Sequence, residues 1–166
     1  MTSEVIDFSR DAPILRQQLN PEMTMSIPQS SFLRRTLVLD ASVSGATALL
    51  LVTAAGLLTN VLALPEALLR YAGAVLVPFV IFVVYVARQP NVPRAGVFSI
   101  IMLNVAWVLA SVWLLLSDKV RPNALGTAFI IVQAVAVALF GELQYVGLRR
   151  AARLERDGPA YVGSKS

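Results

Sequence analysis

Two acidic residues, Asp40 and Glu142, stand inside long apolar stretches of this 166-residue chain. A carboxyl group in such a place can bind a proton or a cation, or pair with a basic side chain. Asp40 follows Arg35 by five residues, and Glu142 precedes Arg149 by seven. At the rise of an α-helix, each acid would lie about 8–10 Å from its basic neighbour. We therefore expect both acids at a similar depth, where they could face one another or the arginines.

The surroundings of the two acids differ. Asp40 shares one helical face with Ser44 and Thr47, at spacings of four and three residues, which favours an inward orientation. The helix dipole also stabilises an anion near a helix N-terminus, so a purely structural role for Asp40 stays open. Glu142 lies toward the C-terminal end of its stretch, where the dipole disfavours an anion. Either it has a functional role or it forms a structural salt bridge with Arg34, Arg35 or Arg88.

Amide side chains complete the set of polar candidates. Asn104 lies near the middle of the third apolar stretch, where the ordinary role of an amide is an interhelical hydrogen bond. Gln133 and Gln144 lie eleven residues apart on one side of the fourth stretch, opposite the side with Glu142. Polar groups on two faces predict contacts with more than one neighbour. The candidate intramembrane polar residues are Asp40, Glu142, Asn104, Gln133, Ser44 and Thr47.

Four apolar stretches must position these side chains. They cover residues 36–58, 67–87, 97–116 and 123–146. Each is long enough to cross the hydrocarbon core of a bilayer, about 30 Å, as a helix. Hydrophobic residues make up 57% of the chain and charged residues 14%, against about 25% charged in a typical soluble domain. We predict an all-α fold, a four-helix transmembrane bundle made of two helical hairpins.

The domain organisation follows from these stretches. Residues 1–31 are polar and carry three prolines, so we expect a mostly disordered cytoplasmic tail, with a short interfacial helix as the alternative. Residues 32–150 form the bundle, and residues 151–166 a basic cytoplasmic tail. Pro65 and Pro122 precede the second and fourth stretches, where proline suits the first helical turn.

Basic residues indicate the orientation in the membrane. With four spans, eleven of the 14 basic residues fall on the side of the two termini. The positive-inside rule then places both termini in the cytoplasm. Arg70 falls on the other side, where its side chain can extend to the lipid headgroups. The basic residues at the predicted boundaries are Arg34, Arg35, Arg70, Arg88, Arg149 and Arg150.

The composition also excludes several kinds of chemistry. The chain has no cysteine and no histidine, which excludes disulfides, thiol redox chemistry and the usual ligands of zinc or haem iron. A hard cation held by carboxylates and carbonyls stays open. We expect no catalytic residue, no metal, no cofactor and no enzymatic activity. The net charge of +4 is concentrated at the predicted membrane boundaries, which favours the lipid bilayer as a partner and argues against nucleic acid.

Three segments resemble those of small inner-membrane proteins of bacteria: 39–45 (LDASVSG), 64–70 (LPEALLR) and 141–150 (GELQYVGLRR). The four-span, two-hairpin layout is similar to that of the broad DoxX-like group. This resemblance covers the four stretches but not the N-terminal tail, and it implies a multi-pass protein of the bacterial inner (plasma) membrane with no particular activity.

The layout also resembles that of small multidrug-resistance transporters, whose essential acid lies in their first helix, where this chain has Asp40. The chain departs from that family in its longer tails, in its second acid, Glu142, and in lacking the family's signature in the third helix.

Three functions fit these features. The first is a non-catalytic accessory or scaffold subunit, associated with other membrane proteins or with itself, and the absence of a catalytic motif favours it. The second is a small transporter coupled to protons or cations, in which Asp40 and Glu142 bind the cation and Asn104 and Gln133 line the path. A polar cavity joining these residues would support it. The third is an enzyme acting on lipid or quinone, for which we find no paired acids at a defined spacing.

Overall fold

The described part of the chain, residues 28–157 of a computed structural model, consists of helices and short connections without any strand. The predicted tail segments 1–27 and 158–166 lie outside it. Four of the helices are long and apolar enough to cross a membrane, as the sequence predicted for an all-α integral membrane protein. In chain order the helices are α2 (Pro28–Thr53), α3 (Ala55–Leu62), α4 (Glu66–Arg88), α5 (Arg94–Leu116) and α6 (Ala124–Asp157).

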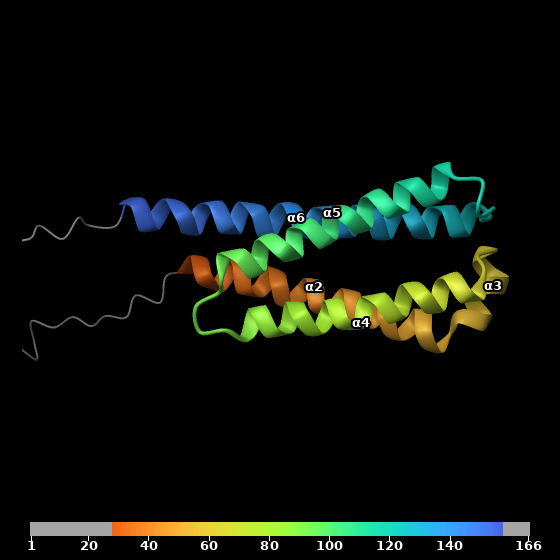
Figure 1. Cartoon of the computed structure of the whole chain (residues 1–166), viewed down its shortest axis with the longest axis horizontal. Helices are drawn as coiled ribbons and strands as arrows, with labels where there is room; N and C mark the ends of the chain where they lie inside the picture. The colour runs from red at the N-terminus through yellow and green to blue at the C-terminus, as the bar shows by residue number, and fades with distance from the viewer. Residues whose placement is uncertain (1–27, 158–166) are drawn as a thin grey trace, which may run out of the picture.

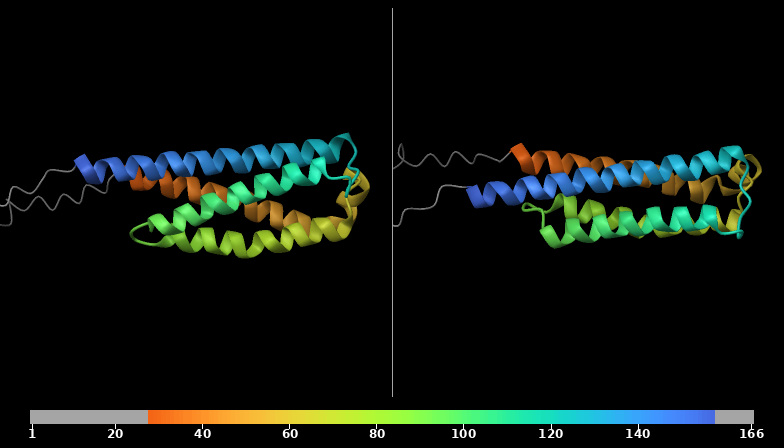
Figure 2. Two further views of the ribbon diagram at one scale, coloured as in Figure 1. Left: turned by 45° about the horizontal axis from the view of Figure 1, so that its top comes forward. Right: turned by 90° about the horizontal axis from the view of Figure 1, so that it is seen from above.

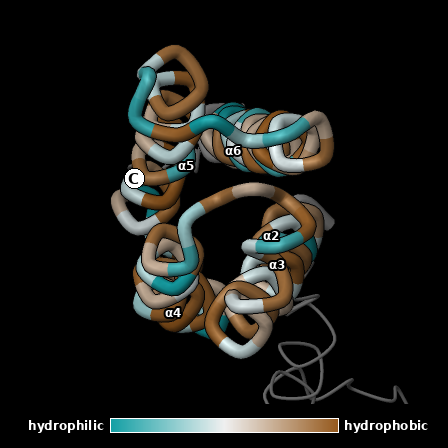
Figure 3. Tube along the Cα trace, turned by 90° about the vertical axis from the view of Figure 1, so that its right-hand side faces the viewer, coloured by the Kyte–Doolittle hydropathy of each residue, from teal (hydrophilic) through white to brown (hydrophobic). Residues whose placement is uncertain are grey.

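The long helices form two hairpins. The helix α2 packs along α4, α5 packs along α6, and α2 also contacts α6 (Figure 1). Viewed along the bundle, α5 and α6 lie on one side, and α2, α3 and α4 on the other (Figure 3). The start of α2 and the end of α6 lie at the same end of the bundle, here called the terminal end (Figure 1). The opposite end, which carries α3, is here called the α3 end.

The helices α4 and α5 follow one another in the chain, yet they pack together far less than the partners of either hairpin do. They leave the connection at residues 89–93 side by side at the terminal end and then diverge (Figures 1 and 2). At the start of α5, Gly96 lies against Val86 of α4. Along most of its length, α4 is therefore held by α2, and α5 by α6.

The first apolar stretch differs from the expected single helix over residues 36–58. The helix α2 ends at Thr53, and α3 begins at Ala55. After α3, Ala63 adopts the left-handed conformation, with φ 53°, and its N–H donates to the carbonyl of Thr59. Both sides of the break at Ala54 are apolar, so hydropathy alone gives no sign of the change in helix direction.

The helices extend beyond the predicted bundle at the terminal end. The helix α2 begins at Pro28, so residues 28–31 are helical although the sequence placed them in the N-terminal tail. The helix α6 continues to Asp157, so residues 151–157 of the predicted C-terminal tail are helical as well. In this way α6, with 34 residues, projects past the other helices (Figure 2).

Asn123 joins α6 to α3 at the α3 end. Its side-chain oxygen accepts a hydrogen bond from the N–H of Gly126 at 2.8 Å, which caps the start of α6. Its side-chain nitrogen donates to the carbonyl of Val61 at 2.8 Å. Gly126 itself lies against the carbonyl of Leu62, where a Cβ atom would collide with backbone. The close approach of α6 to the end of α3 thus requires glycine at this position.

The buried apolar residues form two clusters along the bundle. The cluster nearer the terminal end includes Leu37 of α2, Val83 of α4 and Ile100 of α5. The cluster nearer the α3 end includes Leu51 of α2 and Leu76 of α4. Four of the buried polar residues lie along their helices between residues of these two clusters, namely Asp40 and Ser44 of α2, Asn104 of α5 and Gln144 of α6. The candidate site is built from them.

Candidate functional site

A buried cluster of four polar side chains is centred on Asp40, which is 0% exposed. Its Oδ2 accepts hydrogen bonds from Gln144 Nε2 at 2.7 Å and from Asn104 Nδ2 at 3.3 Å. Its Oδ1 accepts one from Ser44 Oγ at 3.1 Å. Asn104 Nδ2 also lies 3.3 Å from Gln144 Oε1, to which it donates. These four residues, here called the Asp40 cluster, join α2, α5 and α6.

The positions of these residues along their helices place the cluster inside the spans. Asp40 lies five residues beyond Arg35, or about 8 Å along α2. Asn104 lies ten residues beyond Arg94, or about 15 Å along α5. A carboxylate at such a depth needs strong hydrogen bonds in place of water. The two amides and the hydroxyl supply three of them.

No basic side chain pairs with Asp40 among the described residues. Of the two arginines in α2, Arg34 is half-buried and Arg35 is exposed. The Arg34 side chain donates to the carbonyls of Gln89 and Pro90, at 2.8 and 3.2 Å, and not to Asp40. The negative charge of the carboxylate is therefore compensated only by the dipoles of neutral groups. Such a group is chemically able to take up a proton or a small cation.

Glu142 does not face Asp40, which corrects one of the arrangements that the sequence left open. Its side chain is exposed, while Gln144, two residues further along α6, points to Asp40. A separation of two positions along an α-helix corresponds to a rotation of about 200° around its axis. The side chains of Glu142 and Gln144 therefore leave α6 on opposite sides. The expected salt bridge to Arg34, Arg35 or Arg88 is also not formed, and Glu142 has no ion pair with any residue of the described part.

Glu142 borders a cavity of about 310 Å³ between α5 and α6. Asn104 borders the same cavity. It also borders a second cavity, of about 350 Å³, which Ser44 lines as well. Apart from these polar groups, Tyr145 and a tryptophan, both cavities have apolar walls. Asn104 thus separates the exposed acid from the buried one, and no polar cavity joins the two acids in the described structure.

The remaining candidates lie apart from the cluster. Thr47 is half-buried, and its hydroxyl donates to the carbonyl of Val43 in its own helix at 2.9 Å. Gln133 is half-buried and lines another cavity, about 16 Å along α6 from Gln144. Of the six candidates, the structure therefore brings together Asp40, Ser44 and Asn104, and it leaves Glu142, Gln133 and Thr47 outside.

Gln144 is the member of the cluster that the candidate set lacked. The available signal was the alignment of Gln133 and Gln144 on one side of the fourth stretch, which indicates that this side faces other helices. Trp107 also lay outside the candidate set. Its indole Nε1 is the buried side-chain nitrogen that finds no hydrogen-bond partner within residues 31–153.

The boundary basic residues lie at the two ends of the bundle. Arg70 at the α3 end pairs with Glu66, with Nη2 and Oε1 2.8 Å apart, and both side chains are exposed. At the terminal end, Arg149 stacks 5.5 Å from the centre of the Tyr145 ring and Arg150 lies 5.8 Å from that of Phe32. Arg35 and Arg88 are exposed.

The described residues thus provide a buried carboxylate held by neutral donors and, on the outer face of α6, an exposed carboxylate without a partner. In comparisons with protein-family models, curated proteins and solved structures, the chain matches none of them.

Proposed function

We propose that this integral membrane protein is a non-catalytic accessory or scaffold subunit that associates with another membrane protein along α5 and α6. Glu142 carries the proposal. It lies seven residues, or about 10 Å, before Arg149 within a spanning helix, and its side chain is exposed. Exposure of an acidic side chain to lipid costs about 2.5–3.5 kcal/mol at the centre of a span. A basic or amide side chain of a partner helix would remove this cost.

The shape of the surface around Glu142 supports the same proposal. The cavity at this position lies between α5 and α6, and its walls include the small residues Ala138 and Gly141. Small residues at such a surface allow a second helix to approach closely. Gly141, beside Glu142, has only ordinary contact distance to Asn104, 3.7 Å from an added Cβ, so packing within the bundle does not require glycine there.

The Asp40 cluster has a supporting role in this proposal. Its hydrogen bonds join the first, third and fourth spans into one unit. A buried polar network whose members are satisfied makes a bundle more rigid and specifies a single arrangement of its helices. Such a unit presents the α5–α6 surface in a fixed geometry to a partner.

Purification from the native membrane in a gentle detergent tests the proposal. We expect a partner protein to copurify in stoichiometric amount with the unchanged protein and to be lost from the Glu142→Gln variant. This substitution removes the negative charge of the side chain and keeps its shape. Glu66→Gln is the matched control, because Glu66 is an exposed acid whose partner, Arg70, lies in its own chain. A protein that purifies alone, or a partner that Glu142→Gln retains, would contradict the proposal.

The second candidate is a small carrier coupled to protons or cations. Two observations favour it: Asp40 has no cationic partner among the described residues, and Asn104 contacts Asp40 while bordering the cavity of Glu142. In this case Asp40 and Glu142 would take up the cation in turn. Transport by the purified protein in vesicles should then disappear in the double variant Asp40→Asn, Glu142→Gln. Normal transport by that variant would exclude the carrier.

A further inference from the structure

A groove runs along the outer face of the hairpin formed by α2 and α4. It holds two cavities, of about 440 Å³ nearer the terminal end and about 330 Å³ further from it. The lining residues recur every three or four positions along each helix, from Arg34 to Val52 on α2 and from Val77 to Arg88 on α4. Because this spacing keeps residues on one side of a helix, the two cavities lie in line. We call them together the α2–α4 groove.

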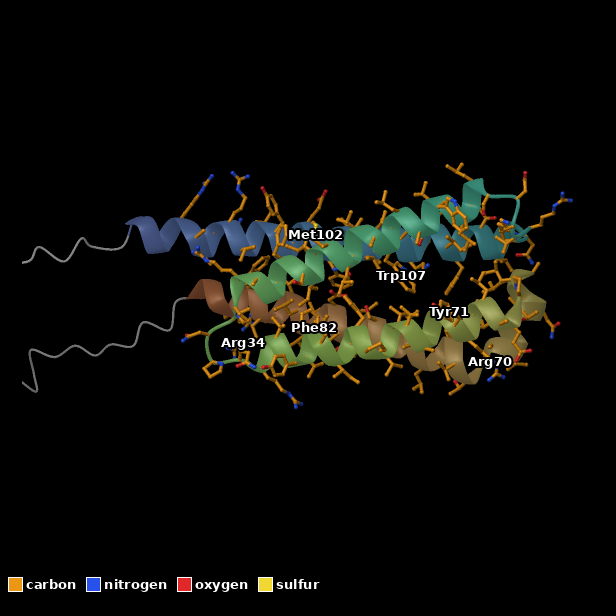
Figure 4. All side chains as sticks on the ribbon, in the orientation of Figure 1. Arg34, Arg70, Tyr71, Phe82, Met102 and Trp107 are labelled. Carbon is orange, nitrogen blue, oxygen red and sulfur yellow. The ribbon has the colours of Figure 1, made fainter. Side chains whose placement is uncertain are left out.

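Two arginines stand at the terminal end of the groove. Arg34 and Arg88 line its first cavity, and no carboxylate of the described residues pairs with either of them. Arg34 is held in place, since its Nη2 donates to the carbonyls of Gln89 and Pro90 at 2.8 and 3.2 Å. Figure 4 shows its labelled side chain at the terminal end, beside the connection between α4 and α5. Both carbonyls are neutral, so this end of the groove keeps the positive charge of the two arginines.

The remainder of the groove is apolar. Besides the arginines, Ser42 is the one polar residue of the lining, and its hydroxyl donates to a carbonyl of its own helix at 2.8 Å. Gly45 lies 11 residues, or about 16 Å, beyond Arg34, and Val77 lies 11 residues before Arg88. This length matches one half of a hydrocarbon core of about 30 Å. The groove therefore offers an apolar path from the arginines to the middle of the membrane.

The charge at one end and the apolar length together restrict the class of ligand. A soluble anion would contact the arginines and leave the apolar part of the groove unused. A lipid without net charge would fill the apolar part and leave the arginines without a counter-charge. Guanidinium groups match the geometry of phosphate oxygens, and basic pockets between transmembrane helices bind anionic headgroups. A molecule that joins a negatively charged phosphate to an acyl chain fits both parts of the groove.

We propose that the α2–α4 groove binds an anionic phospholipid. Its phosphate accepts hydrogen bonds from Arg34 and Arg88, and one acyl chain follows the groove past Ser42 toward Gly45. A guanidinium group has five N–H groups, so Arg34 can donate to the phosphate through Nε and Nη1 while Nη2 stays on the two carbonyls. The groove belongs to α2 and α4, whereas Glu142 belongs to α6 in the other half of the bundle (Figure 3). The lipid site is therefore independent of any partner bound at Glu142.

Native mass spectrometry of the purified full chain in detergent micelles tests the proposal. The protein is titrated with dioleoylphosphatidylglycerol, and dioleoylphosphatidylcholine is the matched probe, because it has the same acyl chains and no net charge. We expect phosphatidylglycerol to bind saturably at a concentration about 5- to 25-fold lower, the effect of one to two basic residues near an anionic headgroup. Glycerol phosphate, a headgroup without acyl chains, should not compete at the same concentrations. Equal binding of the two lipids, or competition by glycerol phosphate, would overturn the proposal.

Two pairs of variants locate the binding. Arg88→Gln should weaken the binding of phosphatidylglycerol about five-fold. Arg35→Gln removes an exposed arginine at the same end of the bundle but outside the groove, and should leave the binding unchanged. Val38→Phe narrows the groove and should weaken the binding of both lipids, whereas Val43→Phe, on the same helix and similarly exposed but outside the groove, should not. Equal effects within either pair would overturn the proposal. All four side chains are exposed, so we expect each variant to fold.

Discussion

Gln144 donates a hydrogen bond of 2.7 Å to Asp40 across 104 positions of the sequence, the shortest contact of the Asp40 cluster. The bond joins the first span to the last, and Asn104 of the third span contacts both residues. The two helical hairpins are therefore connected through polar side chains in the layer between the two apolar clusters. In lipid, where apolar contacts between helices gain little over contacts with acyl chains, such bonds contribute to helix association.

Replacing Gln144 should weaken the bundle. Gln144→Leu removes the closest donor to the Asp40 carboxylate and leaves that oxygen with one long hydrogen bond from Asn104. We expect a loss of about 1.5–3 kcal/mol in the free energy of unfolding, the range for hydrogen bonds to charged groups. Gln133→Leu is the control, since Gln133 lies on the same helix and outside the cluster. Reversible unfolding in mixed micelles measures both, and equal effects would show that the cluster does not stabilise the bundle.

Asp40 itself should tolerate an amide better than an apolar side chain. In Asp40→Asn, the new oxygen can accept from Gln144 and Asn104, and the new nitrogen can donate to Ser44. Asp40→Leu removes the acceptor of the Gln144 and Ser44 donors, while Asn104 keeps its hydrogen bond to Gln144 Oε1. The cost is about 1–3 kcal/mol for each donor that finds no other acceptor. We expect unfolding free energies close to that of the unchanged protein for Asp40→Asn and clearly lower for Asp40→Leu. The reverse order would mean that the charge, and not the hydrogen bonds, holds the helices together.

Gly126 should resist enlargement. A Cβ at this position meets the carbonyl of Leu62 and lies 2.9 Å from Cβ of Pro122, so the start of α6 would have to move away from α3. We expect Gly126→Ala to lower the free energy of unfolding by about 1–3 kcal/mol, the usual cost of overpacking. Gly56→Ala is the control, because its nearest neighbour is 3.9 Å away and alanine favours the helix. Similar stabilities of the two variants would contradict the close approach of α6 to Leu62.

The sequence was sufficient to predict the four spans and the all-α fold, because span length and apolar composition follow directly from the thickness of the bilayer. It also placed Asp40 and Ser44 on one face at a spacing of four residues, and the structure joins them by a hydrogen bond. The interhelical role expected of Asn104 is likewise present. These features depend on local periodicity, which a single sequence contains.

Other features depend on the direction of helices in space. In the sequence, Glu142 is the residue of the fourth span whose exposure to lipid costs the most free energy. The residue that contacts Asp40 is nevertheless Gln144, about 200° further around α6. Hydropathy does not report which side of a helix faces its neighbours. The divergence of α4 and α5, and with it the two cavities between them, follows from the packing of each helix against a different partner, which no local pattern encodes.

Site-specific photo-cross-linking in the native membrane tests the role of Glu142 most directly. A photoreactive residue at Ala138, which lines the cavity of Glu142, is compared with one at Val132, an exposed position of α6 that borders none of the cavities described above. We predict one discrete cross-linked product of higher mass from Ala138, no such product from Val132, and its disappearance when Glu142→Gln is added. A protein that gives only lipid adducts from both positions, or a product that persists with Glu142→Gln, would contradict an accessory subunit docked at this surface.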